Sequence, residues 1–291
     1  MIEVVLITDK NYFKFSLTTI HSLLKSTRSE ISITCIITDV SSQDVLKAET
    51  FFRKEKIKIL KFDDSCFKEI KTKKHVSRAA YIKILLPNIL VDKERIIFLD
   101  SDLLVRRDIS ALWDEFNENY MIQAVWNPGY DYDNKICNLD ENDETFNTGV
   151  MLMNLKKMRD GNITKKLSRF IDEKNHLTKL NDQAAFNAIF ANSWGRLDLK
   201  WNVQFQFYWK KSGDLKIRLC EKKELLKNPF ILHFTSHSKP WMFRNAHPFK
   251  YAFKENYFEV NNELLNYNDI IFISALQKLK EFVRICWFRN K

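Results

Sequence analysis

The first hundred residues alternate between short apolar runs and longer segments in which apolar side chains recur at every third or fourth position. The runs have the length of strands that are buried on both faces, and they cover residues 3–8, 31–38, 57–62 and 95–99. The segments between them predict helices over residues 12–26, 41–53 and 78–90. This alternation predicts an α/β fold with a right-handed, mostly parallel sheet flanked by helices.

The second half of the chain has a mixed pattern. Two further strands are predicted over residues 120–126 and 146–154, and two further helices over 162–174 and 181–192. The stretch 127–145 is polar and rich in turn residues, which predicts a long loop of the kind that is often functional.

Composition narrows the ways in which such a fold can bind a nucleotide. The 291 residues are 45% hydrophobic, which is enough for a large core, and they include only five glycines, no two of them close together. A G-x-G-x-x-G or G-x-x-x-x-G-K-[ST] loop is therefore impossible, so a metal ion would have to hold the phosphates of a bound nucleotide. The five cysteines are scattered and odd in number, which is typical of ordinary thiols in a reducing compartment.

Two acidic residues directly follow the fourth predicted strand. In Phe98-Leu99-Asp100-Ser101-Asp102, both carboxylates would lie beyond the carboxyl end of a buried strand, where open α/β sheets bind ligands. Two acids held together repel each other unless a cation lies between them. Carboxylate oxygens suit Mg²⁺ and Mn²⁺, so the pair predicts a metal site and, through the metal, a bound diphosphate.

A histidine and a lysine later in the chain are the next candidates. His233 follows the apolar run 229–232, and Lys239 lies six residues further on. A histidine at the end of a buried strand is more often a core residue than a ligand, but a nearby ammonium can meet a phosphate as a point charge. Together the two side chains could close a pocket over a metal-bound diphosphate.

Amide and carboxylate side chains offer contacts for sugar hydroxyls. Asn147 lies at the start of a predicted strand, where Gly149 would let the backbone come close to a ligand. Asp182 and Gln183 open a predicted helix, and Asn181 and Asp182 also suit the N-cap of that helix.

Six blocks, taken in order, resemble glycosyltransferase family eight, whose members have the GT-A fold. The blocks are Thr8-Asp9-Lys10-Asn11-Tyr12, His75-Val76-Ser77 with Ala80-Tyr81-Ile82-Lys83, Phe98-Leu99-Asp100-Ser101-Asp102, Phe146-Asn147-Thr148-Gly149-Val150-Met151-Leu152-Met153-Asn154-Leu155, Asn181-Asp182-Gln183 and His233-Phe234-Thr235-Ser236-His237-Ser238-Lys239-Pro240-Trp241. They span about residues 3–245, and the likeness is greatest to bacterial lipopolysaccharide and lipo-oligosaccharide glucosyl- and galactosyltransferases.

Three positions depart from the pattern of this family. Lys83 stands where the family usually has arginine, which keeps the charge but loses the bidentate fork. Ser236 stands where it often has glycine, and a side chain there narrows the approach to the diphosphate. Asn127 stands where some relatives have an aspartate near the sugar, which weakens the case for galactose as the donor.

The resemblance implies a retaining transferase that uses a UDP-sugar with Mn²⁺ or Mg²⁺. It assigns the metal to Asp100, Asp102 and His233, and catalysis to Asp182 and Gln183, which also hold the sugar. The further donor-binding residues that it implies are Thr8, Asp9, Asn11, Tyr12, His75, Lys83, Ser101, Asn147, Ser236 and Lys239. Because an amide is a poor nucleophile, we favour front-side attack by the acceptor, with Gln183 steadying positive charge at the anomeric carbon.

The C-terminal segment predicts a contact with a membrane. Residues 270–291 carry apolar and aromatic positions on one arc and basic positions on the other, which is typical of an interfacial amphipathic helix. The net charge of +10 suits an anionic membrane surface, whereas the dispersed basic residues and the lack of an RNA-binding motif argue against nucleic acid. The alternative is a terminal helix that docks on the core.

We therefore expect a GT-A catalytic domain over residues 1–250 and a helical, basic, aromatic tail over 251–291. Residues 1–9 read as a first strand and not as a signal peptide. The resemblance further implies a glycan or glycolipid acceptor such as lipopolysaccharide. We expect a cytoplasmic protein that is peripherally attached to the inner face of the plasma membrane.

Two other interpretations stay open. One is a glycogenin-like enzyme that glucosylates itself, and the other is a non-catalytic glycan- or membrane-binding protein on the same fold. A sugar nucleotidyltransferase would need a glycine-rich phosphate loop, and the chain has neither the G-x-S-x-G nor the H-E-x-x-H motif of two hydrolase classes. The sequence leaves the sugar, the linkage, the acceptor and the oligomeric state open.

Overall fold

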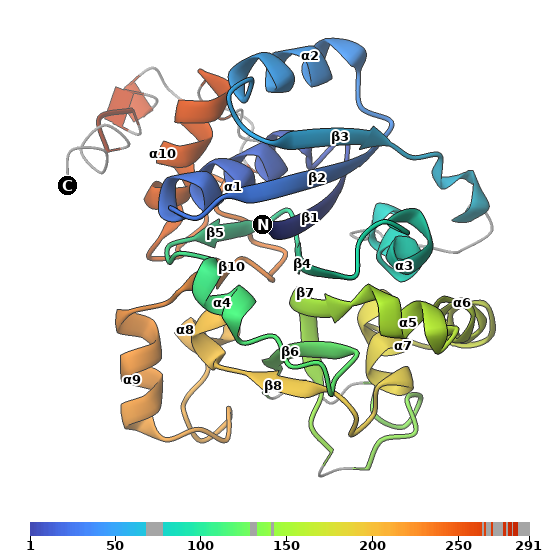
Figure 1. The fold of residues 1–291 in the computed structure, drawn as a ribbon. Helices are drawn as coiled ribbons and strands as arrows, with labels where there is room; N and C mark the ends of the chain where they lie inside the picture. Colours follow the sequence, from blue (N-terminus) through green and yellow to red (C-terminus); the bar gives the residue numbers. More distant parts are fainter. Residues whose placement is uncertain are drawn as a thin grey trace.

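In the computed structural model, the described residues are 1–67, 78–128, 133–140 and 143–263, together with 265, 269, 276, 277, 279, 280 and 282–284. Within them the chain forms a mixed sheet of seven strands in the order β3-β2-β1-β4-β7-β6-β8, flanked by helices (Figure 1). Its strands are β1 Ile2–Asp9, β2 Ile31–Thr38, β3 Ile57–Lys61, β4 Arg95–Leu99, β6 Ile122–Trp126, β7 Phe146–Asn154 and β8 Gly195–Leu197. The six predicted strands are confirmed, each to within two residues.

Strand direction changes in the middle of this sheet. β3, β2, β1 and β4 run parallel, as the alternation of strands and helices predicted. β7 pairs antiparallel with both β4 and β6, and β8 joins β6 in parallel. The two halves meet at β4, whose carboxyl end leads into Asp100 and Asp102.

The helices predicted over 12–26, 41–53, 162–174 and 181–192 are confirmed, and the helix predicted over 78–90 is interrupted by a proline. The described α-helices are α1 Phe13–Ser26, α2 Ser42–Phe51, α3 Leu86–Ile89, α4 Ser110–Asp114, α5 Leu155–Asp160, α6 Ile163–Lys174, α7 Asp182–Ile189, α8 Gln206–Trp209, α9 Leu219–Lys227 and α10 Lys250–Asn261, with the 3₁₀ helices η1 Asp64–Phe67, η2 Arg78–Leu85 and η3 Leu199–Asn202. The single helix predicted over 78–90 is η2 followed by the short α3. Pro87, at the start of α3, lacks an N–H and disfavours helical geometry in the residue before it.

A second, three-stranded sheet lies beside the acidic pair. It contains β5 Leu103–Val105, β10 Ile231–His233 and β9 Val203–Gln204, in the order β5-β10-β9. β10 runs antiparallel to β5 and parallel to β9. His233 therefore pairs with Leu103, the residue that directly follows Asp102.

The core consists of apolar layers on both faces of the large sheet. Along β1, Val5 and Ile7 belong to one buried cluster, whereas Val4 and Leu6 belong to the other. This alternation is expected of a strand that is covered on both faces. The packing holds the carboxyl ends of β1 and β4 side by side.

Helix α10 packs against α1, although the two lie at opposite ends of the chain (Figure 1). Phe253 and Tyr257 of α10 are buried in a third apolar cluster together with residues of β9 and β10. His21 Nδ1 of α1 lies 3.0 Å from Asn256 Oδ1. The division of the chain at residue 250 stays a prediction, and this packing shows that α10 shares a core with the preceding residues.

The tail prediction falls mostly outside the described residues. Those that are described, 276, 277, 279, 280 and 282–284, are helical. The Phe282 ring lies 5.9 Å from that of Phe258, and Arg284 Nη1 donates to the Tyr251 hydroxyl over 2.9 Å. The large apolar side chains that stay exposed on this helix, each by more than half, are Leu276, Leu279 and Val283. Across the described part of the chain, no helix is long and apolar enough to cross a membrane.

Candidate active site

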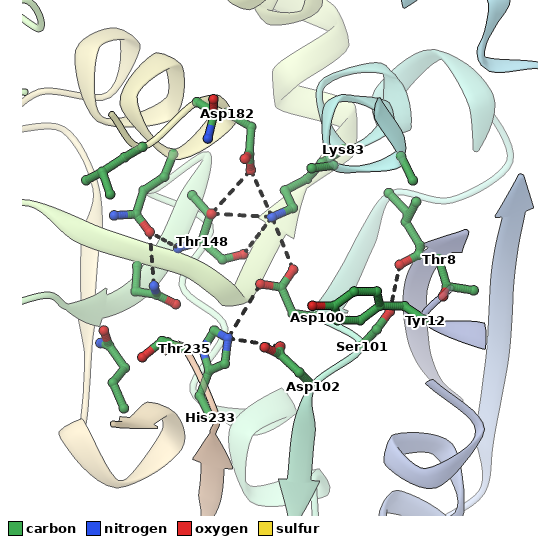
Figure 2. Close-up of a pocket in the computed structure, with 18 of the residues that line it drawn as sticks. Thr8, Tyr12, Lys83, Asp100, Ser101, Asp102, Thr148, Asp182, His233 and Thr235 are labelled. Atoms are coloured by element: carbon green, nitrogen blue, oxygen red, sulfur yellow. Dashed lines mark hydrogen bonds and ion pairs between the residues drawn. The ribbon is translucent and has the colours of Figure 1, made fainter. Parts of the chain in front are cut away.

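A cavity of about 370 Å³ lies where the carboxyl ends of β1 and β4 approach β7, β10 and α7 (Figure 2). The predicted site residues that line it are Thr8, Asp9, Tyr12, Lys83, Asp100, Ser101, Asp102, Asn147, Asp182, Gln183, His233 and Lys239. Asn11 is exposed and Ser236 is half-buried, and neither is among the lining residues. His75 lies outside the described residues, so its role stays a prediction.

The acidic pair and His233 converge on one point of this cavity (Figure 2). His233 Nε2 lies 3.2 Å from Asp102 Oδ1 and 3.7 Å from Asp100 Oδ2. One possible ligand atom from each of the three residues lies within 4.8 Å of the others. This spacing allows one metal ion to contact all three side chains.

Two hydrogen bonds hold the turn that carries the acids. Asp100 N donates to Gly149 O of β7 over 2.8 Å. Ser101 Oγ donates to Ile7 O of β1 over 2.8 Å. The turn is therefore tied to both strands that neighbour β4, and the Ser101 hydroxyl already has a structural partner.

Lys83 joins the acidic pair to the start of α7. Its Nζ lies 3.2 Å from Asp100 Oδ1 and 3.1 Å from Asp182 Oδ2, and it also donates to Thr148 O over 3.3 Å. The side chain is almost fully buried. Burial by itself lowers the pKa of Lys83, but Asp100 and Asp182 outweigh it, so the pKa lies above its ordinary value and the ammonium stays charged.

Lys239 forms a similar buried pair on the other side of the acids. Its Nζ lies 2.6 Å from both Asp102 Oδ2 and Phe234 O. Burial by itself raises the pKa of Asp102, but Lys239 and His233 outweigh it and hold that pKa well below its usual range. The Asp102 carboxylate is therefore ionised and available as a ligand.

The charges around these side chains fit a divalent cation. Asp100, Asp102 and Asp182 supply three carboxylates against the two ammonium groups that contact them. Burial raises the pKa of Asp100 despite the opposing effect of Lys83 and His233, so its negative charge is only partly offset. A divalent cation beside Asp100, Asp102 and His233 would relieve this excess, and carboxylate and imidazole groups are both metal ligands in proteins.

The opposite wall of the cavity is built by the start of β7 and of α7. Gln183 Oε1 accepts hydrogen bonds from Asn147 Nδ2 over 3.0 Å and from Thr148 N over 3.4 Å. Thr148 Oγ1 donates to Asp182 Oδ2 over 3.4 Å. These bonds hold the amide of Gln183 and the carboxylate of Asp182 side by side.

Neither of the expected capping residues caps α7. Asn181 occupies the N-cap position, but its side chain makes no capping hydrogen bond, and its φ is 52°. Its Oδ1 instead accepts from the Tyr81 hydroxyl over 3.4 Å. Asp182 binds Lys83. The capping interpretation of these two residues is therefore wrong, and both line the cavity.

Tyr12 and Asp9 form the end of the cavity nearest β1. Asp9 Oδ1 accepts from Asn11 N over 2.9 Å and from Tyr12 N over 3.0 Å, which orients the turn into α1. The Tyr12 ring meets that of Trp241 edge to face, with centroids 5.5 Å apart. Burial raises the pKa of Tyr12, so its hydroxyl stays neutral and can donate a hydrogen bond.

Sequence reasoning assigned no role to several polar residues in or behind this cavity, among them Thr148, Lys179, Asn202, Gln204 and Thr235. Asn202 supports His233 from behind. Gln204 lines the cavity, and its buried Nε2 has no hydrogen-bond partner among the described residues. Asn202 ends η3, and Gln204 lies in the two-residue strand β9. Neither element is long enough to show a periodic pattern of apolar residues.

Gly149 leaves room for the close approach of the His233 ring, and its expected approach to a ligand stays a prediction. A Cβ at this position would lie 2.2 Å from His233 Cε1 and 2.7 Å from His233 Nδ1.

Gly149→Ala should displace the imidazole, weaken Mn²⁺ binding and lower the free energy of unfolding by about 1–3 kcal/mol. Calorimetric Mn²⁺ titration and chemical denaturation measure the two effects. Gly213→Ala is the matched control, because nothing lies within 4 Å of its Cβ position. Equal behaviour of the two variants would contradict this prediction.

Known proteins resemble this chain in sequence. It is 33% identical over 199 residues to General stress protein A of Bacillus subtilis, which covers 67% of this chain and 70% of that protein. It is 27% identical over 245 residues to Glycosyltransferase GlyF of Streptococcus pneumoniae, which covers 82% of this chain but only 57% of that protein.

Solved structures resemble it in fold. Galactosyltransferase LgtC, solved in complex with donor and acceptor sugar analogs, superposes with a TM-score of 0.79 at 18% identity, covering 96% of this chain and 100% of that one. Glycosyltransferase GlyE of Streptococcus pneumoniae gives a TM-score of 0.67 at 21% identity, covering 90% of this chain and 63% of that one. The likeness confirms the predicted GT-A fold. Because the sequence model of glycosyl transferase family 8 matches residues 3–244, the chain belongs to this family.

Proposed function

We propose that this chain is a retaining glycosyltransferase that moves a hexose, glucose or galactose, from a UDP-sugar to a glycan acceptor such as lipopolysaccharide. One observation carries the proposal. The possible metal ligands Asp100, Asp102 and His233 share one cavity with Lys239 and with the sugar-binding candidate Asp182. Such a cavity suits a diphosphate whose sugar must be held beside it.

In this proposal Asp100, Asp102 and His233 would hold Mn²⁺ or Mg²⁺. The ion would supply positive charge to the diphosphate and stabilise UDP as it leaves. Lys239, whose Nζ already contacts Asp102, adds a second positive charge at the same place. Both charges favour departure of UDP, because negative charge grows on its phosphate oxygens.

The two ends of the cavity suit the two ends of the donor. Figure 2 shows Tyr12 and Thr8 on one side of Asp100, and Asp182 and Thr148 on the other. We place the uridine against the aromatic Tyr12 and the hexose against Asp182. The acceptor would then enter beside the hexose.

Gln183 suits the stabilisation of positive charge and not nucleophilic attack. Its Oε1 accepts hydrogen bonds from Asn147 Nδ2 and Thr148 N, which fix the direction of the amide dipole beside the proposed position of the sugar. An amide oxygen in that position is a poor nucleophile. We therefore retain front-side attack by the acceptor hydroxyl as the route to retention of configuration.

Release of UDP from a panel of UDP-sugars, with Mn²⁺ and with EDTA, tests the proposal. Metal-dependent release from one sugar would support it and identify the donor. Mass spectrometry of the recovered protein separates transfer to an acceptor from self-glucosylation, because only the latter adds hexose to the chain. If no UDP-sugar binds to the protein or releases UDP when Mn²⁺ is present, the result would count against the proposal and favour a non-catalytic role.

Replacing Gln183 with leucine should lower turnover more than donor binding. The change removes the oriented dipole but replaces none of the proposed metal ligands, so we expect kcat to fall about 10²-fold. The affinity for UDP, measured by calorimetry with Mn²⁺, should change only a few-fold. Equal losses in turnover and in UDP affinity would remove Gln183 from its proposed role.

We also propose that residues 270–291 bind an anionic membrane surface, which would place the enzyme at the inner face of the plasma membrane. Leu279 and Val283 are more than half exposed on the described part of this helix. Replacing both with serine should abolish sedimentation with anionic lipid vesicles while UDP release stays unchanged. Leu46→Ser, at an exposed leucine of α2, is the matched control. Unchanged sedimentation of the double variant would refute membrane binding through these residues.

A further inference from the structure

Asn202 contacts a proposed metal ligand from behind. It is the last residue of η3, and the parallel pairing of β9 with β10 brings it beside His233. Its side chain is completely buried, and its Oδ1 lies 2.9 Å from His233 Nδ1. A buried polar side chain in this position is expected to orient the imidazole.

The backbone determines which way the amide of Asn202 faces. Gly149 N donates to Asn147 Oδ1 over 2.9 Å, so this oxygen is an acceptor. The Asn202 atom that lies 2.8 Å from it must then be the donor, Nδ2. Oδ1 of Asn202 is therefore the atom that faces His233.

An acceptor opposite Nδ1 determines the tautomer of His233. The Nδ1 proton can donate to Asn202 Oδ1, which leaves the lone pair on Nε2. Nε2 lies 3.2 Å from Asp102 Oδ1, on the side where the proposed metal would lie, and that ion would accept the lone pair that otherwise faces the carboxylate. With the proton on Nε2 instead, the Nδ1 lone pair would face the Asn202 oxygen in a buried place, which is unfavourable.

The same network continues to the other wall of the cavity. Asn147 Nδ2 donates to Gln183 Oε1, so the two side chains are linked through Asn147 to Asn202. Two backbone N–H groups set the direction of this network, Gly149 N at Asn147 and Thr148 N at Gln183. We infer that Asn202 is a positioning residue that holds His233 in its metal-binding tautomer and couples it to Gln183. This inference rests on the proposed metal site.

Long-range ¹H–¹⁵N NMR of the wild-type protein with bound Mg²⁺, which is diamagnetic, tests the tautomer directly. The metal-loaded protein is the one to measure, because without an ion Asp102 Oδ1 can itself accept a proton from Nε2. We expect His233 to carry its proton on Nδ1 and to show an Nε2 resonance that is shifted by the ion. Loss of the Nδ1 proton in the metal-loaded protein would overturn the inference, and this measurement needs no variant.

Two variants separate the hydrogen bond between Asn202 and His233 from the hydrogen bond between Asn202 and Asn147. Asn202→Leu removes both, so we expect a mixture of tautomers and Mn²⁺ binding about 10–100-fold weaker by calorimetry. Asn202→Asp keeps an acceptor for His233 Nδ1 but loses the donor to Asn147. It should retain the tautomer and bind Mn²⁺ more tightly than Asn202→Leu does.

The remaining outcomes are distinct. A folded Asn202→Leu protein with wild-type Mn²⁺ affinity and an unchanged tautomer would overturn the inference. Weaker binding in both variants with the tautomer retained in both would also overturn it, because that pattern indicates a general structural role. A wild-type protein that binds no divalent ion would refute the proposed metal site itself, whereas a protein that binds the ion without a proton on His233 Nδ1 would refute only the inference.

Discussion

Replacing Asp102 with asparagine should lower metal-dependent UDP release by at least about 10²–10³-fold. The substitution keeps the shape of the side chain but removes the negative charge that faces His233 Nε2 and Lys239 Nζ. The site then loses a charged metal ligand, and Lys239 loses its only ion-pair partner among the described residues. Initial rates of UDP release over a range of Mn²⁺ concentrations measure the loss.

Asp160→Asn is the matched control for this prediction. Asp160 is an exposed acid that pairs with Lys156 on the surface of α5, so the same chemical change there should leave UDP release unchanged. Excess Mn²⁺ should restore little activity to Asp102→Asn, because the ligand itself has changed. Near wild-type rates for this variant would refute the proposed metal site.

Replacing Lys83 with methionine should lower the free energy of unfolding by about 3–5 kcal/mol. The lysine is almost fully buried, and its ammonium offsets the carboxylates of Asp100 and Asp182. Methionine fills a similar volume, so the loss comes from two acids left near each other without their cation. Urea denaturation with and without Mn²⁺ measures the effect, and Mn²⁺ should recover part of the loss by neutralising Asp100.

Lys156→Met provides the comparison for Lys83. Its ion pair with Asp160 is more than half exposed on both sides, and such pairs contribute at most about 1 kcal/mol. Lys83→Arg should retain more stability than Lys83→Met because it keeps the charge. If both methionine variants had the same free energy of unfolding, the buried ion pairs of Lys83 would not stabilise the protein as we propose.

Local sequence patterns were sufficient for much of this fold. The four parallel strands and the helices α1 and α2 follow from continuous or periodic apolar runs, because each element must bury its apolar face. Elements that are too short for a pattern were missed, including β5 and β9. The interruption of the helix predicted over 78–90 could have been anticipated from Pro87.

The candidate site likewise contains some residues that the sequence indicated and some contacts that only the structure shows. Residue type and position beside a predicted strand or helix indicated the acidic pair, His233 and Gln183 as candidates, and the ordered resemblance assigned their roles. The sequence could not indicate that Gly149 is needed for the approach of an imidazole, because that contact joins β7 to β10. It could not distinguish a capping role for Asp182 from an ion pair with Lys83, because both are compatible with the start of a helix.

The sequence by itself therefore determined the longer elements, the sheet edge at which the candidate site lies and the chemical character of the proposed metal ligands. These depend on the order of residues along the chain, which sets periodicity and strand ends. The tertiary structure alone decided which charges neutralise one another and which way the buried amides face. Asn202 and His233 meet because β9 pairs with β10, and no local pattern records a hydrogen bond between residues brought together from distant parts of the chain.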